Sequence, residues 1–160
     1  DELTDLCRPY LAENLKNITD DKKKETDFIK RVIALEQERL KKLSEIGEAT
    51  AFFFADNLDY NADMLVWKKM LKEEVENNLK TIHKLLEKIP NNVWTKHSTK
   101  DMIISHIEAT QGKTGEYLWP LRVALTGREA SPGPFEIAEV LGKEESLKRI
   151  KMGMAKISKK

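Results

Sequence analysis

The chain reads LRVALTGREASPGPFEIAEVLGKEESLKRI from Leu121 to Ile150, and this stretch predicts one helix end followed by two capped helices. Gly127 is expected to end the first helix, because a left-handed C-terminal residue costs least as glycine. Ser131 is expected to cap the next helix, with Pro132 at the first helical position, where a missing N–H is harmless. Gly142 then ends that helix. The stretch therefore predicts closely spaced helices.

A helical pattern continues on both sides of this stretch, and no alternating strand pattern of useful length interrupts it. The strongest repeat places apolar residues at steps of three and four from Leu71 to Ile89, and Pro90 ends it. We expect this helix to begin after a polar turn that ends at Asn61. The further expected helices are 3–15, a second one leading to Leu43, a third through Phe53, 98–112, 114–125, 132–141 and 144–157.

Polar residues and prolines predict where the other helices start or break. Ser44 and Ser98 are expected caps, and residues 20–21 are expected to start the second helix. Pro9 and Pro120 are expected to interrupt, kink or restart their helices, since each proline removes one internal hydrogen bond.

The length of 160 residues suits one domain or two small ones. We expect an all-α fold of two helical subdomains, 1–70 and 71–160, joined within or near the helix 61–89. The single cysteine, Cys7, excludes an internal disulfide and suits a reducing compartment. No apolar run approaches the ~18 residues that a membrane span needs.

The net charge of +1 hides an asymmetry between the two parts of the chain. Residues 1–92 carry a net charge of −3, and residues 93–160 carry +4. An RNA partner is held chiefly through its phosphates, so the second part is the expected contact surface. The alternative is that the terminal lysines, Lys156, Lys159 and Lys160, only solubilise a helix end.

Two stretches resemble the C-terminal end of bacterial-type glutamyl-tRNA synthetases, which are class I aminoacyl-tRNA synthetases. One is LRVALTGR with SPGPFEI and LGKEESLKRI, within 121–150, and the other is ALEQERLKKLSEIGEATAFFFAD, from Ala34 to Asp56. The resemblance covers nearly the whole chain. It implies the anticodon-binding region, a helical cage of two small all-helical subdomains, without the catalytic body. The start at Asp1, without methionine, also favours a fragment.

The resemblance assigns anticodon contacts to five residues. Arg122 corresponds to the arginine that precedes A-L-T-G in the family, while Ser131 and Pro132 match its Thr/Ser-Pro pair. Pro134 stands where some members carry leucine. Arg39, in the sequence Gln-Glu-Arg-Leu, looks like the arginine that reads the third anticodon base in discriminating members.

The residues themselves leave other roles open for both arginines. A cation beside free backbone N–H groups, expected between Ser131 and Phe135, suits a partly anionic ligand. However, Arg39 can also pair with Glu36, and Arg122 can fix its helix to Glu136 or to a backbone carbonyl.

Two other functions are alternatives. One is a helical protein–protein interaction domain that docks a partner helix on Phe52, Phe53 and Trp67. The other is a small enzyme that uses Cys7 or a histidine. Residues 52–54 are three consecutive phenylalanines and are not expected all to face inward. Tryptophans at helical spacing are more often core than base platforms, which here concerns Trp67, Trp94 and Trp119.

The resemblance also implies partners and cofactors. The partners are the anticodon loop of tRNA(Glu) and the catalytic domain of the same full-length chain, in a cytoplasmic monomer that does not bind membranes. The chain lacks a HIGH-like motif and a Walker loop, so ATP and magnesium are implied only for the full-length enzyme. No metal site is expected, because Cys7 and the three histidines are scattered.

Overall fold

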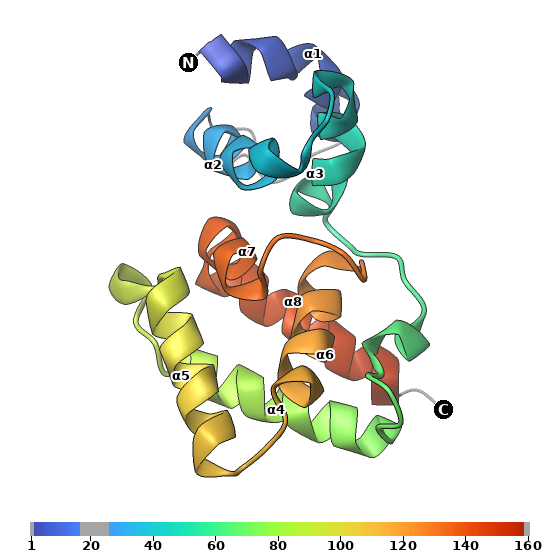
Figure 1. Cartoon of the computed structure of the whole chain (residues 1–160), viewed down its shortest axis with the longest axis vertical. Helices are drawn as coiled ribbons and strands as arrows, with labels where there is room; N and C mark the ends of the chain where they lie inside the picture. The colour runs from blue at the N-terminus through green and yellow to red at the C-terminus, as the bar shows by residue number, and fades with distance from the viewer. Residues whose placement is uncertain (1, 17–25, 159–160) are drawn as a thin grey trace. The chain divides into compact units, whose positions relative to one another are not determined.

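The computed structural model describes residues 2–16 and 26–158, which form helices and no strand, so the all-α prediction is confirmed (Figure 1). The expected helix start at residues 20–21 lies outside the described residues. The α-helices are α1 (Glu2–Lys16), α2 (Thr26–Glu36), α3 (Ile46–Phe54), α4 (Lys72–Glu87), α5 (Lys96–Ala109), α6 (Thr114–Thr126), α7 (Pro134–Leu141) and α8 (Lys143–Ser158). Short 3-10 turns are η2 (Gln37–Arg39), η3 (Leu43–Glu45), η4 (Ala62–Leu65) and η5 (Asn91–Val93). None of the helices in the described ranges is both long and apolar enough to cross a membrane.

The chain divides into two compact units, unit 1 up to Leu58 and unit 2 from Asp59. The boundary between the two units, after Leu58, therefore comes earlier in the chain than the boundary expected after residue 70. Turn η4 packs against α6 and α8, and Tyr60 and Leu65 are buried, so this segment belongs to unit 2. Helical periodicity does not reveal this, because the segment 59–71 contains no α-helix.

In unit 1, α3 packs against both α1 and α2. Its core contains the apolar residues Cys7, Leu11, Ile29, Val32, Ile33, Ile46 and Phe53. The expectation that residues 52–54 do not all face inward is wrong, since all three phenylalanines are buried. Phe54 makes an edge-to-face contact with Phe28 of α2, with ring centroids 5.7 Å apart. Helices on two sides of α3 allow three consecutive side chains to be covered.

Helices α1 and α3 approach each other closely at Gly47, in the first turn of α3. A Cβ atom placed on Gly47 would lie 2.4 Å from the backbone oxygen of Tyr10 in α1. The side-chain amide of Asn14 donates a hydrogen bond to the Gly47 carbonyl at 2.6 Å. Unit 1 therefore depends on a residue without a side chain at position 47.

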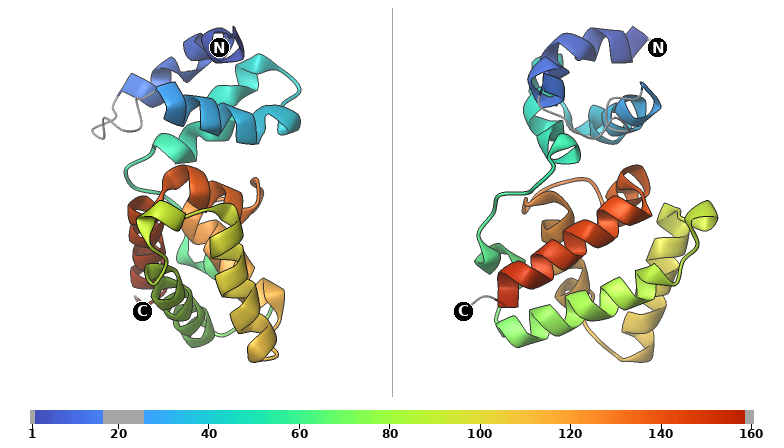
Figure 2. Two further views of the ribbon diagram at one scale, coloured as in Figure 1. Left: turned by 90° about the vertical axis from the view of Figure 1, so that its left-hand side faces the viewer. Right: turned by 180° about the vertical axis from the view of Figure 1, so that it is seen from behind.

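In unit 2, α4 and α8 run side by side in opposite directions, and α6 packs against both (Figure 2). Lys143 Nζ, at the start of α8, donates to the carbonyl of Glu87 at the end of α4. The predicted apolar stripe is confirmed at Val75, Leu79, Ile82 and Leu86, which are fully or almost fully buried. However, α4 begins at Lys72 and not after Asn61, and Leu71 at its N-cap is exposed.

The structure differs from the sequence predictions at two helix starts. The side chain of Thr95, not Ser98, caps α5 by accepting a hydrogen bond from the Ser98 N–H at 3.1 Å. Ser44 lies inside turn η3, and α3 begins after it, at Ile46. Several polar residues near each start can accept the same hydrogen bond, so the local sequence does not decide between them.

The two glycine stops are confirmed, and neither proline ends or restarts its helix. Gly127 ends α6 with a φ of 69°, and Gly142 ends α7 with a φ of 84°. Helix α1 continues through Pro9, and α6 continues through Pro120. Pro120 and the turn after it are buried, and this burial offsets the loss of one backbone hydrogen bond.

We predict that Gly47→Ala destabilises unit 1, because the new methyl group meets a backbone atom that cannot rotate away. The free energy of opening of α1 and α3, measured by amide hydrogen exchange, should fall by about 1–3 kcal/mol. The matched control is Gly133→Ala, where an added Cβ meets nothing closer than 3.7 Å. Equal protection of α1 and α3 in the parent chain and in Gly47→Ala would contradict the prediction.

Candidate nucleic-acid interface

The residues between α6 and α7, here called the 127–133 loop, are held by one arginine of α6. Nη1 of Arg122 donates to the Ser131 carbonyl at 2.7 Å, to Ser131 Oγ at 2.9 Å and, more weakly, to the Pro132 carbonyl at 3.3 Å. Hydrogen bonds from a charged donor are roughly twice as strong as neutral ones. The alternative role of Arg122, in which it fixes its helix to a backbone carbonyl, is therefore confirmed.

The other end of the loop is fixed where α6 stops. Thr126 Oγ1 donates to the Arg122 carbonyl at 2.8 Å and accepts from the Arg128 N–H at 3.0 Å. Gly127 lies between them in the left-handed conformation, where its N–H donates to the Val123 carbonyl at 2.7 Å. The loop thus leaves α6 in a defined direction and returns to it at Arg122.

A second arginine, Arg149 of α8, supports the same helix end and was not predicted from the sequence. Its Nη1 donates to the Leu125 carbonyl at 2.7 Å, and its Nε lies 2.9 Å from Glu145 Oε1. Arg149 is only 3% exposed, so its charge needs these partners. The spacing of four residues between Glu145 and Arg149 on one helix is the sequence signal that could have predicted their ion pair.

Three of the predicted contact residues, Ser131, Pro132 and Pro134, are buried. The predicted cap is wrong: α7 begins at Pro134, with Gly133 in the N-cap position. Ser131 Oγ accepts from Arg122 and donates to the Pro132 carbonyl at 2.8 Å, so its hydroxyl is used within the loop. These side chains shape the loop from inside.

The fifth predicted residue, Arg39, belongs to unit 1, whereas the other four belong to unit 2. It lies in turn η2, directly after α2. Its Nε is 3.5 Å from Glu36 Oε2, as the alternative interpretation expected. The Glu36 side chain is 4% exposed and the Arg39 side chain is 46% exposed, so much of this side chain still faces solvent.

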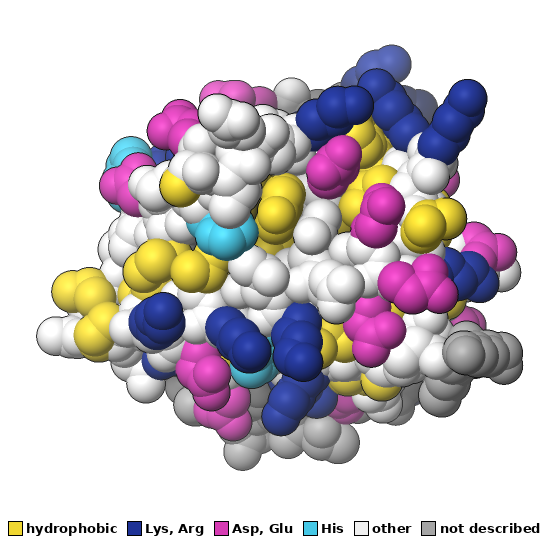
Figure 3. Space-filling model, turned by 90° about the horizontal axis from the view of Figure 1, so that it is seen from below, with side chains coloured by type: hydrophobic (Ala, Val, Ile, Leu, Met, Phe, Trp, Pro, Cys, Tyr) yellow, Lys and Arg dark blue, Asp and Glu magenta, His cyan; other side chains and the backbone are white. Residues whose placement is uncertain are grey.

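A cavity of about 420 Å³ lies beside the end of the 127–133 loop. Its walls are the start of α5, with Lys96, His97 and Lys100, and the start of α7, residues 133–136; Leu118 of α6 also contributes. On the face shown in Figure 3, basic side chains gather in separate groups with acidic side chains between them, and they form no continuous stripe. For contact with an anionic ligand, we therefore consider local basic groups such as Lys96 and Lys100 and not the net charge of the chain.

Comparison with known proteins supports a nucleic-acid interface. The family model described as "Anticodon binding domain" matches residues 2–154. The chain belongs to the anticodon-binding domain family. It is 36% identical over 159 residues to the glutamate–tRNA ligase of Clostridium botulinum, covering 98% of this chain and 31% of that protein. Against the ligase of Clostridium tetani it is 42% identical over 139 residues, which are 84% of this chain and 27% of that one.

This anticodon-binding domain resembles the C-terminal region of glutamate–tRNA ligase and spans about three tenths of the curated relatives it matches. A solved structure of a glutamate tRNA ligase from Elizabethkingia meningosepticum has a similar fold, with a TM-score of 0.78 and 22% identity. That match covers 98% of this chain and 29% of the solved chain. A second structure, from Elizabethkingia anophelis, gives a TM-score of 0.69 with 23% identity over 96% of this chain and 28% of that one.

The tryptophans of the anticodon-binding domain support its core. Trp94 is buried, and its indole N–H donates to the Ala138 carbonyl at 2.8 Å. The indole N–H of Trp119 donates to the Met64 carbonyl at 2.9 Å. Trp67 lies so close to Gly115 that a Cβ there would come within 2.4 Å of its ring. All three side chains are thus used in intramolecular contacts.

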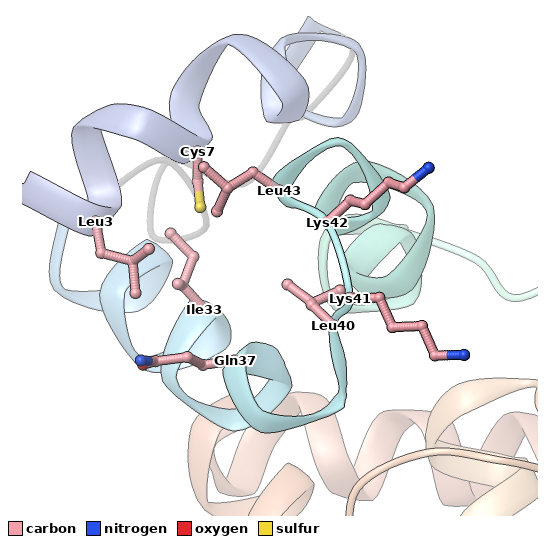
Figure 4. Close-up of a pocket in the computed structure, with 8 residues that line it drawn as sticks. All are labelled: Leu3, Cys7, Ile33, Gln37, Leu40, Lys41, Lys42 and Leu43. Atoms are coloured by element: carbon pink, nitrogen blue, oxygen red, sulfur yellow. The ribbon is translucent and has the colours of Figure 1, made fainter.

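The two alternative functions, a small enzyme that uses Cys7 and a protein–protein interaction domain, find no support in the structure of unit 1. Cys7 is fully buried beside Leu3, Ile33 and Leu43 at a small cavity, and its burial raises the pKa of the thiol (Figure 4). A raised pKa disfavours the thiolate that nucleophilic catalysis needs. Phe52 and Phe53 are 4% and 0% exposed, so neither offers a surface to a partner helix.

Within residues 2–16 and 26–158, no group of three or more His, Cys, Asp or Glu side chains is placed to hold a metal ion.

We predict that Arg122→Ala lowers the free energy of unfolding of unit 2 by about 1.5–3 kcal/mol, because the loop carbonyls lose a charged donor. Arg122→Lys should recover only part of this loss, since an ammonium lacks the planar geometry of a guanidinium. Urea unfolding followed by tryptophan fluorescence measures this unit selectively, because all three tryptophans follow residue 58.

The matched control is Glu129→Ala, at an exposed position of the same loop, which should change stability by less than about 0.5 kcal/mol. An Arg122→Ala chain as stable as the control would show that the arginine does not hold the loop.

Proposed function

We propose that this chain binds the anticodon loop of a tRNA as part of a glutamate–tRNA ligase. The observation that carries the proposal is the 127–133 loop, held in one shape by Arg122 inside a domain of the anticodon-binding family. Single-stranded RNA loops are recognised by protein groups that stack on unpaired bases and hydrogen-bond to their edges. A loop that is already ordered binds them with less loss of conformational entropy.

In this proposal Arg122 has a positioning role as well as any contact of its own with RNA. It fixes Ser131 and Pro132, which define the course of the backbone into α7. Pro134 then starts α7 with a fixed φ, so the loop and the helix start form one stiff element. The RNA would meet the outer edge of this element.

Arg39 would read a base edge directly. Its partly exposed ion pair with Glu36 contributes on the order of 0–1 kcal/mol, so a base can compete for the guanidinium at little cost. A guanidinium presents a planar fork of donors, which matches two acceptors on one base edge. We therefore assign the third anticodon base to Arg39.

The wider function follows from the same resemblance. The partners would be tRNA(Glu) and the catalytic domain of the full-length chain, in a cytoplasmic monomer. ATP and magnesium would be bound by that catalytic domain, and this chain would place the tRNA for it. The length shared with the ligases, about three tenths of theirs, supports this division of labour.

We predict that the chain distinguishes a tRNA(Glu) transcript from a transcript that differs only at the third anticodon base. The expected discrimination is about 1–3 kcal/mol, the scale of a bidentate arginine–base pair in DNA complexes. Arg39→Gln should reduce this discrimination to nearly zero, as measured by competition binding at one fixed salt concentration.

The control is Arg31→Gln, at an exposed position of α2 in the same unit, which should leave the discrimination unchanged. Binding that is insensitive to Arg39→Gln and Arg122→Ala together would contradict the proposed site.

A further inference from the structure

The cavity between the starts of α5 and α7 lies next to the proposed RNA site and has no role in it so far. Its volume of about 420 Å³ is within the ~300–1,000 Å³ range of pockets that hold small ligands. The backbone N–H of Lys96 donates to the carboxylate of Glu139 in α7. This bond ties the two helix starts together, so both walls of the cavity are fixed to each other.

The charges on the α5 wall are unfavourable for the isolated domain. Lys96 and Lys100 are four residues apart on one face of α5, and like charges at this spacing destabilise a helix. Lys96 also occupies the first turn of α5, where the positive end of the helix dipole disfavours cations. The first turn of α5 contains no acidic residue, whereas α6, α7 and α8 each have at least one.

Little in the described part of the chain neutralises these lysines. Neither Lys96 nor Lys100 forms an ion pair among the described residues, and Glu136 is the acidic side chain that lines the cavity. The other nearby carboxylate, Glu139, accepts from the backbone of Lys96. An anion that enters the cavity would therefore meet a wall that carries Lys96 and Lys100, for which the described residues supply no ion-pair partner.

The position of the cavity indicates which anion it would bind. Gly133 and Pro134 belong both to its wall and to the end of the loop that Arg122 holds. A nucleic-acid strand lying along the loop would bring its phosphates to the α5 wall. We propose that Lys96 and Lys100 bind backbone phosphates of the same RNA whose anticodon is contacted by the 127–133 loop. This inference rests on the proposed function and adds a contact that carries affinity without sequence specificity.

The test is the salt dependence of tRNA binding by the 160-residue chain and by its double variant Lys96→Gln/Lys100→Gln. Each phosphate contact that is lost should reduce the slope of log K against log [salt] by about 0.7, the value for single strands, so the expected reduction is about 1.4. Discrimination at the third anticodon base should not change, because phosphates carry no base identity.

The matched control is Lys80→Gln/Lys84→Gln, which removes two exposed lysines at the same spacing from α4. Its slope should equal that of the parent chain, and circular dichroism should show that both variants are folded. A further variant, Lys96→Arg/Lys100→Arg, should keep the parent slope, since it keeps both charges.

The outcomes separate the two proposals. If the parent chain does not bind the tRNA(Glu) transcript, the proposed function fails, and the phosphate site fails with it. If the parent chain binds and the two glutamine variants have the same slope, only the phosphate site is overturned. A reduced slope in Lys96→Gln/Lys100→Gln alone supports both.

Discussion

The shape of the 127–133 loop in unit 2 depends on hydrogen bonds from a single guanidinium nitrogen. Arg122 Nη1 joins the last turns of α6 to the carbonyls of Ser131 and Pro132, so it closes the connection between two helices. Behind it, Arg149 holds the Leu125 carbonyl from α8. Two arginines thus satisfy carbonyl groups at the end of α6 and beyond it, where a helix lacks its own donors.

This arrangement separates the residues that build the surface from those that can contact a ligand. Ser131, Pro132 and Pro134 are buried, so in the proposed function they would act on RNA recognition through the shape of the backbone. Arg39 differs, because its side chain is 46% exposed and its ion pair with Glu36 is easily replaced. The two kinds of residue should therefore respond differently to substitution: one group changes stability, and the other changes specificity.

The parts of the fold that depend on local conformation can be predicted from the sequence. Gly127 and Gly142 stop their helices because a positive φ favours glycine wherever it occurs. The apolar stripe from Val75 to Leu86 predicts a buried helix face for a similar reason, since helical periodicity is a property of the segment alone.

The parts that depend on tertiary contacts cannot be predicted in this way. Ser131 has the right chemistry for a cap, but Arg122 and the Pro132 carbonyl use its hydroxyl. Whether an arginine points to solvent or to its own protein is decided by carbonyls that other segments bring near it. The cavity at α5 was missed for the same reason, because Lys96 and Gly133 are distant in sequence.

We infer that the 127–133 loop is ordered before any RNA binds, because Arg122 holds it. The most direct measurement is ¹⁵N relaxation of the free chain at the loop amides, compared with those of α6 and α7. If Arg122 holds the loop, the loop amides have order parameters near 0.85, equal to those of the helices. Values below about 0.6, typical of a flexible segment, would contradict it.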